Sequence, residues 1–171
     1  GAQSGAFVFL NNDVLELYAR SSVNEEAKMV PAREISEVSD LPVSVIQYVR
    51  RTQDTVLLDH AEKDERFHQD QYLQTHSIAS ILCMPVIHQQ ALLGIIYLEN
   101  RLTKGSFTAE RTDLLSLLSG QIAITLHNAL LYDQLEQRVE ERTREIEKQK
   151  NKLNHQNLQL TELNEEKDFL I

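Results

Sequence analysis

The stretch SILCMPVIHQQALLGIIYLEN (Ser80–Asn100) decides the fold of this chain. It consists of two apolar segments, Ser80–Ile87 and Ala91–Asn100, which are joined by the polar residues His88-Gln89-Gln90. Apolar runs of this length around a short polar turn are typical of a β-hairpin. Because the apolar residues are nearly continuous rather than alternating, both faces of the two strands should be covered. We therefore predict an α+β fold in which helices or long loops flank an antiparallel sheet on each side.

The segments before this hairpin show shorter patterns. Asn11-Asn12-Asp13 has turn chemistry between two strand-like runs, which indicates a second hairpin. Pro42 stands at the start of a run whose apolar residues are spaced as in a helix. We expect strands at Ala6–Asn11, Val14–Arg20 and Thr55–Ala61, a helix at Val43–Gln53, a loop with at most a short strand at Ser21–Asp40, and a loop with one or two helical turns at Glu62–Ser77.

One long helix is predicted from Thr108 to Ile171, because this segment has a single glycine, Gly120, and no proline. Thr108 is a suitable N-cap. At 1.5 Å per residue the helix would be about 90 Å long, more than the core of a domain of this size requires. Its first part, Leu114–Leu131, is rich in leucine, isoleucine and alanine and is expected to pack on the sheet. The expected sheet-facing stripe consists of Leu115, Leu118, Ile122, Leu126 and Leu130.

From Tyr132 onward the apolar residues follow a seven-residue spacing, which is the signature of a coiled coil. The a positions are Tyr132, Val139, Ile146, Leu153 and Leu160, and the d positions are Leu135, Arg142, Gln149, Gln156, Leu163 and Leu170. Because the middle d positions are polar, the coiled coil should be weak, and a single solvated helix is the alternative. A lone polar helix of this length is marginal in water, which favours pairing. The predicted dimer seam is Tyr132, Leu135, Val139, Ile146, Leu153, Leu160 and Leu163.

Composition excludes several classes of function. The chain has 171 residues and a net charge of −9 without a basic stripe, which argues against nucleic acid and anionic membranes as partners. No apolar run approaching 18 residues and no signal-peptide pattern is evident. The single cysteine, Cys83, rules out an intramolecular disulfide. These features indicate a cytoplasmic protein, or a cytoplasmic part of a larger one, with one domain and an extension.

The order of these elements resembles a GAF domain, in particular the GAF domains of large bacterial multidomain kinases. The resemblance implies a GAF-like sensor domain over residues 1–131, with the helix that usually precedes the first strand largely missing from this sequence. The residues that carry it are LLDHA (Leu57–Ala61), RFHQDQYL (Arg66–Leu73), SILCMPV (Ser80–Val86), LLGIIYLEN (Leu92–Asn100), GSFTAERTDLLSLLSGQIAI (Gly105–Ile124) and HNALLY (His127–Tyr132).

The last part of the chain resembles the linker that leads into the dimerisation helix of a sensor histidine kinase. The matching stretches are EQRVEERTREIEKQ (Glu136–Gln149) and LTELNEEKDFLI (Leu160–Ile171). In that family the phosphoacceptor histidine follows the stretch that corresponds to Lys167–Leu170, so His155, which precedes it, does not have this role. The resemblance implies a coiled-coil signalling helix over residues 132–171, a parallel homodimer, and a kinase domain of the same polypeptide that this sequence does not contain.

The GAF resemblance also places a candidate ligand pocket between the sheet and the segment Leu58–Ser80. Two readings of this segment stay open. Its aromatic residues line a cavity for a small molecule, with Asp59 at the mouth, or Phe67 and Tyr72 fill the cavity so that no ligand binds. The candidate pocket residues are Asp59, Phe67, Tyr72, His76 and Ile78.

Departures from known GAF motifs argue against specific cofactors. Bilin-binding members carry a cysteine that is usually followed by histidine, whereas Met84-Pro85 follows Cys83, and members that reduce methionine sulfoxide need more than one cysteine. Cyclic-nucleotide-binding members carry an Asn-Lys pair, a phenylalanine and then Asp-Glu. Here Asn100-Arg101 and Phe107 match in part, but Arg111-Thr112 occupies the acidic positions.

Catalytic and metal-binding patterns are also lacking. The histidines His60, His68 and His76 are eight residues apart, which is not a metal-ligand spacing, and we predict neither a metal site nor catalytic residues. The preferred hypothesis is therefore a non-enzymatic sensory module of a two-component histidine kinase. The alternative is a ligand-free dimerisation or scaffold module, which could regulate a nucleotide cyclase instead.

Overall fold

A computed structural model describes residues 1–23 and 25–168 of the chain. It divides into two compact units, Gly1–His127 and Asn128–Ile171. The first unit contains the sheet and the first part of the long helix α3 (Ala109–Asp168). The rest of α3 makes up the second unit. The predicted seam positions Leu160 and Leu163, like the d position Leu170, lie outside the residues whose side chains are described.

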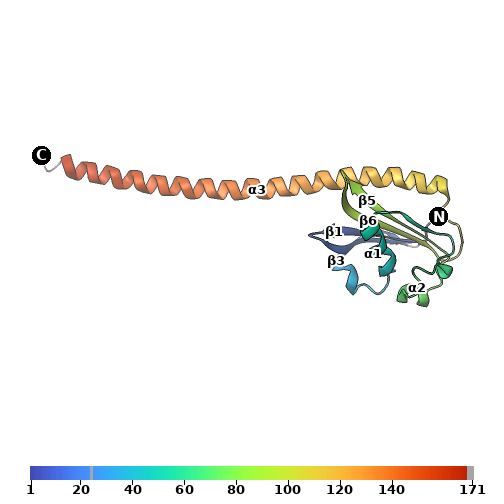
Figure 1. The fold of residues 1–171 in the computed structure, drawn as a ribbon. Coiled ribbons are helices and arrows are strands. Elements are labelled where there is room, and N and C mark those ends of the chain that lie inside the picture. The colour runs from blue at the N-terminus through green and yellow to red at the C-terminus, as the bar shows by residue number, and fades with distance from the viewer. Residues whose placement is uncertain (24, 169–171) are drawn as a thin grey trace. The chain divides into compact units, whose positions relative to one another are not determined.

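The first unit is built on a six-stranded antiparallel sheet, as the apolar hairpin predicted (Figure 1). The strand order is β3-β2-β1-β6-β5-β4, so that β1 and β6, which are far apart in sequence, lie side by side at the centre. The strands are β1 (Ser4–Asn11), β2 (Val14–Ser22), β3 (Glu25–Glu34), β4 (Val56–Leu58), β5 (Ser80–His88) and β6 (Ala91–Asn100).

Both predicted hairpins form through two-residue turns. Asn12 and Asp13 connect β1 to β2 with φ angles of 46° and 64°, and these residue types tolerate the left-handed region well. Gln89 and Gln90 connect β5 to β6 with φ angles of 48° and 68°. Positive φ at both central residues matches the twist of the flanking strands, which explains why each turn is so short.

The segment Ser21–Asp40, predicted as a loop with at most a short strand, contains more strand than expected. The segment completes β2 and forms the ten-residue strand β3, which pairs with β2 at the edge of the sheet. Nearly every β3 side chain is exposed, so the strand carries no apolar alternation that sequence reading could detect. Its charges and Pro31 are typical of an edge strand, where they hinder pairing with other chains.

The sheet is covered on both faces (Figure 1). One face carries α1 (Val43–Thr52), whose Val45, Ile46 and Val49 are buried, and the short helix α2 (Gln71–Thr75). The other face carries the first part of α3, which begins directly after the predicted N-cap Thr108. Two 3-10 turns, Ile35–Glu37 and Ala61–Lys63, complete the unit, and β4 is shorter than the predicted strand Thr55–Ala61.

The sheet-facing side of α3 differs from the predicted stripe. Ser119 and Ala123 are buried, whereas Leu118 and Ile122 are 51% and 41% exposed. Leu115 and Leu126 are half-buried, in agreement with the prediction. Small side chains at the contact allow the helix to lie close to the sheet, and the larger residues then point elsewhere. Apolar spacing alone could not distinguish these two sides.

One helical segment of the described chain, Ala109–Asn157, is long and apolar enough to cross a membrane by length and composition alone. Polar residues such as Gln121 and Asn128 interrupt this segment, so it does not contradict the expectation that no continuous apolar run approaches 18 residues. Within its most apolar window only 11% of the residues are fully buried.

Gly94→Ala should destabilise the sheet strongly. A Cβ atom at Gly94 would lie 2.6 Å from the Val8 carbonyl oxygen and 2.9 Å from Cζ of Phe7. Because the carbonyl belongs to the neighbouring strand, relief requires a backbone shift, and we expect a loss of about 1–3 kcal/mol in the free energy of unfolding. Urea denaturation measures this loss.

The matched control is Gly120→Ala, because a Cβ atom there meets nothing within 4 Å. Alanine should stabilise this helical position by up to about 1 kcal/mol. Equal midpoints for the Gly94 variant and the unmodified chain would contradict the close approach of β1 and β6.

Candidate ligand site

A cavity of about 370 Å³ lies on the face of the sheet that α1 and α2 cover. Its walls come from β1, β2, β3 and β6, from the loop before α1, and from α2. It therefore collects residues from both ends of the domain sequence. Its charged and aromatic lining residues are Arg20, Glu25, Lys28, Asp40, Tyr72, His76, Tyr97, Glu99 and Arg101.

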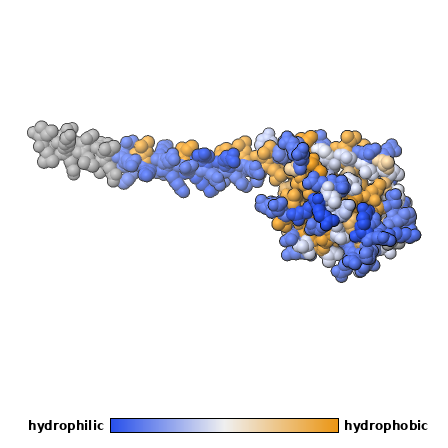
Figure 2. Space-filling model, viewed as in Figure 1, coloured by the Kyte–Doolittle hydropathy of each residue, from blue (hydrophilic) through white to orange (hydrophobic). Residues whose placement is uncertain are grey.

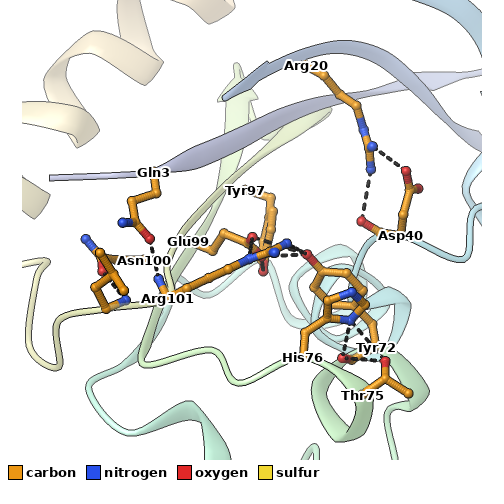
Figure 3. A network of polar contacts seen from close by, with 11 residues as sticks. Gln3, Arg20, Asp40, Tyr72, Thr75, His76, Tyr97, Glu99, Asn100 and Arg101 are labelled. Atoms are coloured by element: carbon orange, nitrogen blue, oxygen red, sulfur yellow. Dashed lines mark hydrogen bonds and ion pairs between the residues drawn. The ribbon is translucent and has the colours of Figure 1, made fainter. Parts of the chain in front are cut away.

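A buried carboxylate forms the floor of this cavity (Figure 3). Tyr97 and Glu99 are two residues apart on β6 and therefore point to the same face. Glu99 is 1% exposed and accepts hydrogen bonds from the Tyr97 hydroxyl at 2.7 Å and the Tyr72 hydroxyl at 2.9 Å. Arg101 Nε donates to Oε1 of Glu99 at 3.0 Å. These donors satisfy a charge whose burial would otherwise be costly.

The two phenols are held in their protonated form. Burial, followed by the charge and hydrogen bond of Glu99, raises the pKa of Tyr72 to about 12. Burial raises the pKa of Tyr97 well above its usual range, and the charge of Glu99 acts in the same direction. At neutral pH both hydroxyls therefore donate to Glu99, and the network serves as a structural support rather than a proton relay.

Asp70 fixes the helix that carries Tyr72. Its Oδ1 accepts the backbone N–H groups of Tyr72 at 2.9 Å and Leu73 at 3.3 Å, which caps α2. Its Oδ2 accepts the N–H of Ser44 at 2.9 Å, in the first turn of α1. One carboxylate that is only 8% exposed thus joins the start of both helices. The ring of His76 stacks on Tyr72 with a centroid distance of 4.4 Å and continues this wall of the cavity.

A second ion pair closes the opposite wall (Figure 3). Arg20 on β2 donates through Nη1 to Oδ2 of Asp40 and through Nη2 to the Asp40 carbonyl oxygen at 3.0 Å. The pair joins the sheet to the loop before α1. Nε of Arg20 is buried and has no acceptor among the described residues.

The structure brings only two of the predicted pocket residues, Tyr72 and His76, to this cavity. Phe67 is buried in the core, where its ring packs edge-on against Tyr48 at 5.5 Å, and Ile78 is a core residue with 1% exposure. Asp59 is exposed and does not stand at the cavity mouth; its carbonyl oxygen accepts the N–H of Gly105 at 3.3 Å. Whether any predicted residue contacts a ligand stays a prediction.

Sequence reading missed the residues that define the floor and the far wall. Tyr97 and Glu99 had a detectable signal, because an acidic residue at the end of an apolar strand is unusual when both faces are covered. Arg20 and Asp40 had none, since their pairing depends on how β2 meets the loop before α1.

The Asn100-Arg101 pair has local partners in this chain. Oδ1 of Asn100 accepts the N–H groups of Leu102 at 2.9 Å and Thr103 at 2.7 Å, and so holds the turn after β6. Arg101 pairs with Glu99 instead of with a downstream acid. Arg111, which replaces an acidic residue of the cyclic-nucleotide motif, donates to the Ser106 carbonyl oxygen at 2.8 Å.

Two further features of the described residues bear on cofactors. Cys83 is fully buried, and burial raises the pKa of its thiol, so the reactive thiolate is disfavoured. Within residues 1–23 and 25–168, no group of three or more His, Cys, Asp or Glu side chains is arranged to hold a metal ion.

The family model of the GAF domain matches residues 1–126. The chain belongs to the GAF domain family. This confirms the resemblance inferred from the sequence blocks and the α+β fold class. GAF domains are generally regulatory rather than catalytic, so a regulatory role is the coarse functional statement that the family supports.

The chain is similar to short stretches of two much longer proteins. It is 35% identical over 118 residues to "Hybrid signal transduction histidine kinase G" of Dictyostelium discoideum, an alignment that covers 69% of this chain and 3% of the kinase. It is 26% identical over 140 residues to "Probable 3',5'-cyclic phosphodiesterase pde-5" of Caenorhabditis elegans, covering 78% of this chain and 19% of that protein. The chain thus spans a small part of both relatives.

A solved structure shares the fold. The GAF domain of a two-component sensor histidine kinase from Bacillus halodurans superposes with a TM-score of 0.57 at 18% identity. The match covers 77% of this chain and 86% of that one. At this identity the likeness bears on the fold alone.

Tyr72→Phe should make the alkaline unfolding of this GAF domain less steep. Between pH 10 and 12 an unfolded tyrosine loses its proton while folded Tyr72 keeps it, so stability falls as pH rises, by up to about 1.4 kcal/mol per pH unit for one such group. Phenylalanine at position 72 removes this contribution to the pH dependence of stability, whereas the contribution of Tyr97 remains. Urea denaturation at several pH values above 9 measures the slope, and an unchanged slope would contradict the buried phenol.

Proposed function

We propose that the chain is a cytoplasmic sensory GAF module of a two-component histidine kinase and acts as a parallel homodimer. In this proposal, paired α3 helices transmit a signal from the GAF unit to a kinase domain of the same polypeptide. The identity shared with the Dictyostelium kinase and the linker-like tail support the kinase connection. The outward apolar side of α3 is the observation that carries the pairing.

The α3 segment of the first unit has two apolar sides. Ala123 faces the sheet and is fully buried, and nine residues at about 100° per residue bring Leu114 to the opposite side of the helix. Leu114, Leu117 and Leu118 are 61%, 75% and 51% exposed. A contiguous apolar surface of this kind on a protein marks an interaction site.

The spacing of the outer side favours a second copy as the occupant. Leu118 precedes Tyr132 by two heptads and Leu114 precedes Leu135 by three, so both leucines fall on a and d positions of the predicted series. The a and d positions between them, Gln121, Thr125 and Asn128, are polar, so the apolar seam is interrupted there. Figure 2 shows orange side chains at intervals among blue ones along α3. The further a positions Val139, Ile146 and Leu153 are 57–63% exposed. A symmetric parallel partner would cover them all, whereas a membrane would also meet the charged residues between them.

The polar d positions give the proposed seam two packings of similar energy. Arg142 contacts Glu145 of its own helix at 3.4 Å, and the side chain of Gln149 is exposed. Polar residues at core positions lower the stability of a coiled coil, so the proposed seam is held only weakly over its middle heptads. A small change in the GAF unit could then shift the equilibrium between the two packings, which is how a signal helix transmits rotation.

Leu118→Glu should shift the 171-residue chain from dimer to monomer, because it places two charges in the apolar seam. Sedimentation velocity over a range of concentrations measures this. The control is Leu102→Glu, since Leu102 is 82% exposed but lies in the loop before α3. If the unmodified chain is monomeric at high micromolar concentration, the paired-helix proposal fails.

Leucine at Arg142, Gln149 and Gln156 should strengthen the dimer and lock kinase output in the full-length protein. The three apolar layers would favour a single packing over its alternative. Phosphorylation assays with and without the stimulus measure the response. Arg144→Leu with Asn151→Leu adds leucine at outer heptad positions and is the matched control. A normal response of the triple variant would rule out the bistable seam.

A second candidate is a ligand-free dimerisation or scaffold module that regulates a nucleotide cyclase. The saturated hydrogen bonding of Glu99 favours it, because the cavity floor is stable without a ligand. The sequence encoded after residue 171 distinguishes the two: a His-Glu or His-Asp phosphoacceptor motif supports the kinase, and a cyclase domain supports the alternative.

A further inference from the structure

The cavity over β6 has balanced charges. Three acids and three bases line it and pair with one another: Arg20 with Asp40, Lys28 with Glu25 at 3.7 Å, and Arg101 with Glu99 at 3.0 Å. Net charge therefore does not select a ligand. The selection depends on which of these groups keep hydrogen-bonding capacity that faces the cavity.

Glu99 has little capacity left for a cation. Both of its oxygens already accept hydrogen bonds, Oε1 from Tyr72 and Arg101 and Oε2 from Tyr72 and Tyr97. Its side chain is 1% exposed. An ammonium ligand would have to displace a tyrosine or the arginine, and would leave the displaced donor without a partner.

Arg101 has free donors beside the aromatic wall of the cavity, and Arg20 has one unpaired donor, its buried Nε. Nε donates to Glu99, and Nη2 donates to the Tyr72 hydroxyl at 3.0 Å, so these contacts use one edge of the guanidinium. Among the described residues Nη1 has no acceptor, and the side chain is 46% exposed. The two Nη groups at the end of the guanidinium form a fork that matches a carboxylate or phosphate group.

The fork is held in place before any ligand arrives. The backbone N–H of Arg101 donates to Oε1 of Gln3 at 2.8 Å, and Glu99 and Tyr72 orient the guanidinium (Figure 3). Such preorganisation lowers the entropic cost of binding. Tyr72 and His76 line the same cavity; Tyr72 is buried beneath the stacked ring of His76, which is half-buried and supplies the surface for the body of a ligand. A volume of about 370 Å³ exceeds what a bare ion needs.

We propose that this cavity binds a small molecule with a carboxylate or phosphate group, which the free fork of Arg101 holds while the body of the molecule packs on His76. This ligand class goes beyond the signalling role proposed above. Arg101 also pairs with the buried Glu99, which accepts a hydrogen bond from Tyr72 of α2. An anion bound to Arg101 would therefore compete with Glu99 for the guanidinium. Binding would thus act on the contact between β6 and α2.

Titration of the 171-residue chain with three matched probes tests this. Benzoate and phenyl phosphate carry the two anionic groups on a flat ring, and benzamide is their neutral counterpart. We expect calorimetry to show saturable binding of at least one anion, with benzamide weaker by about tenfold or more. The tighter anion identifies which of the two groups the natural ligand carries.

Arg101→Lys keeps a positive charge beside Glu99 but removes the fork, and should weaken anion binding by about tenfold. Arg66→Lys is the control, because Arg66 pairs with Asp64 and does not line this cavity. If the Arg101 variant does not fold, the shift of the Arg101 Nε–H resonance of the unmodified chain during the titration decides the question.

Three results would overturn the proposal: no saturable binding of either anion in the millimolar range, equal binding of benzamide, or a folded Arg101→Lys chain that binds as tightly as the unmodified one. Because these measurements do not involve kinase output or the dimer seam, such a failure would leave the signalling proposal standing.

Discussion

The pairing of β1 with β6 is the constraint on which the rest of the GAF unit depends. It joins the N-terminal strands β1–β3 to the later strands β4–β6 in one sheet, with Ser4 opposite Glu99 and Phe9 opposite Gly94. Gly94 is needed here because a side chain would meet the backbone of β1. The cavity exists only because of this pairing, since its walls come from both halves of the sheet. Residues separated by about eighty positions in sequence thereby form one site.

Within that frame, Glu99 organises the polar side of the domain. A buried carboxylate requires donors, and Tyr72, Tyr97 and Arg101 supply them from α2, from the same strand and from its end. The requirement fixes the position of α2 over the sheet, where Asp70 links it to α1. Because Nε and Nη2 make these contacts, Nη1 of Arg101 has no acceptor among the described residues. A single arginine thus supports the buried carboxylate and supplies the free donors of the proposed anion site.

The first part of α3 has two sides with different burial. Small residues on one side, Ser119 and Ala123, bring it close to the sheet. The large apolar residues on the opposite side remain exposed, among them Leu114 and Leu117. A helix that is buried on one side only would not need leucine on the other. We propose that this division of the helix surface lets a change in the domain reach a partner helix without unfolding the core.

The sequence by itself determined the antiparallel sheet, both hairpins, α1 and the extent of α3, because apolar continuity, turn residues and helix signals are local patterns. It also identified the GAF family from ordered blocks. Strand β3 escaped detection because exposed edge residues carry no apolar period. Of the residues that line the cavity, the sequence predicted only Tyr72 and His76. Its other walls depend on contacts such as Arg20 with Asp40 and Arg101 with Glu99. Only the tertiary structure decided those, since strand order, not sequence spacing, sets which side chains meet.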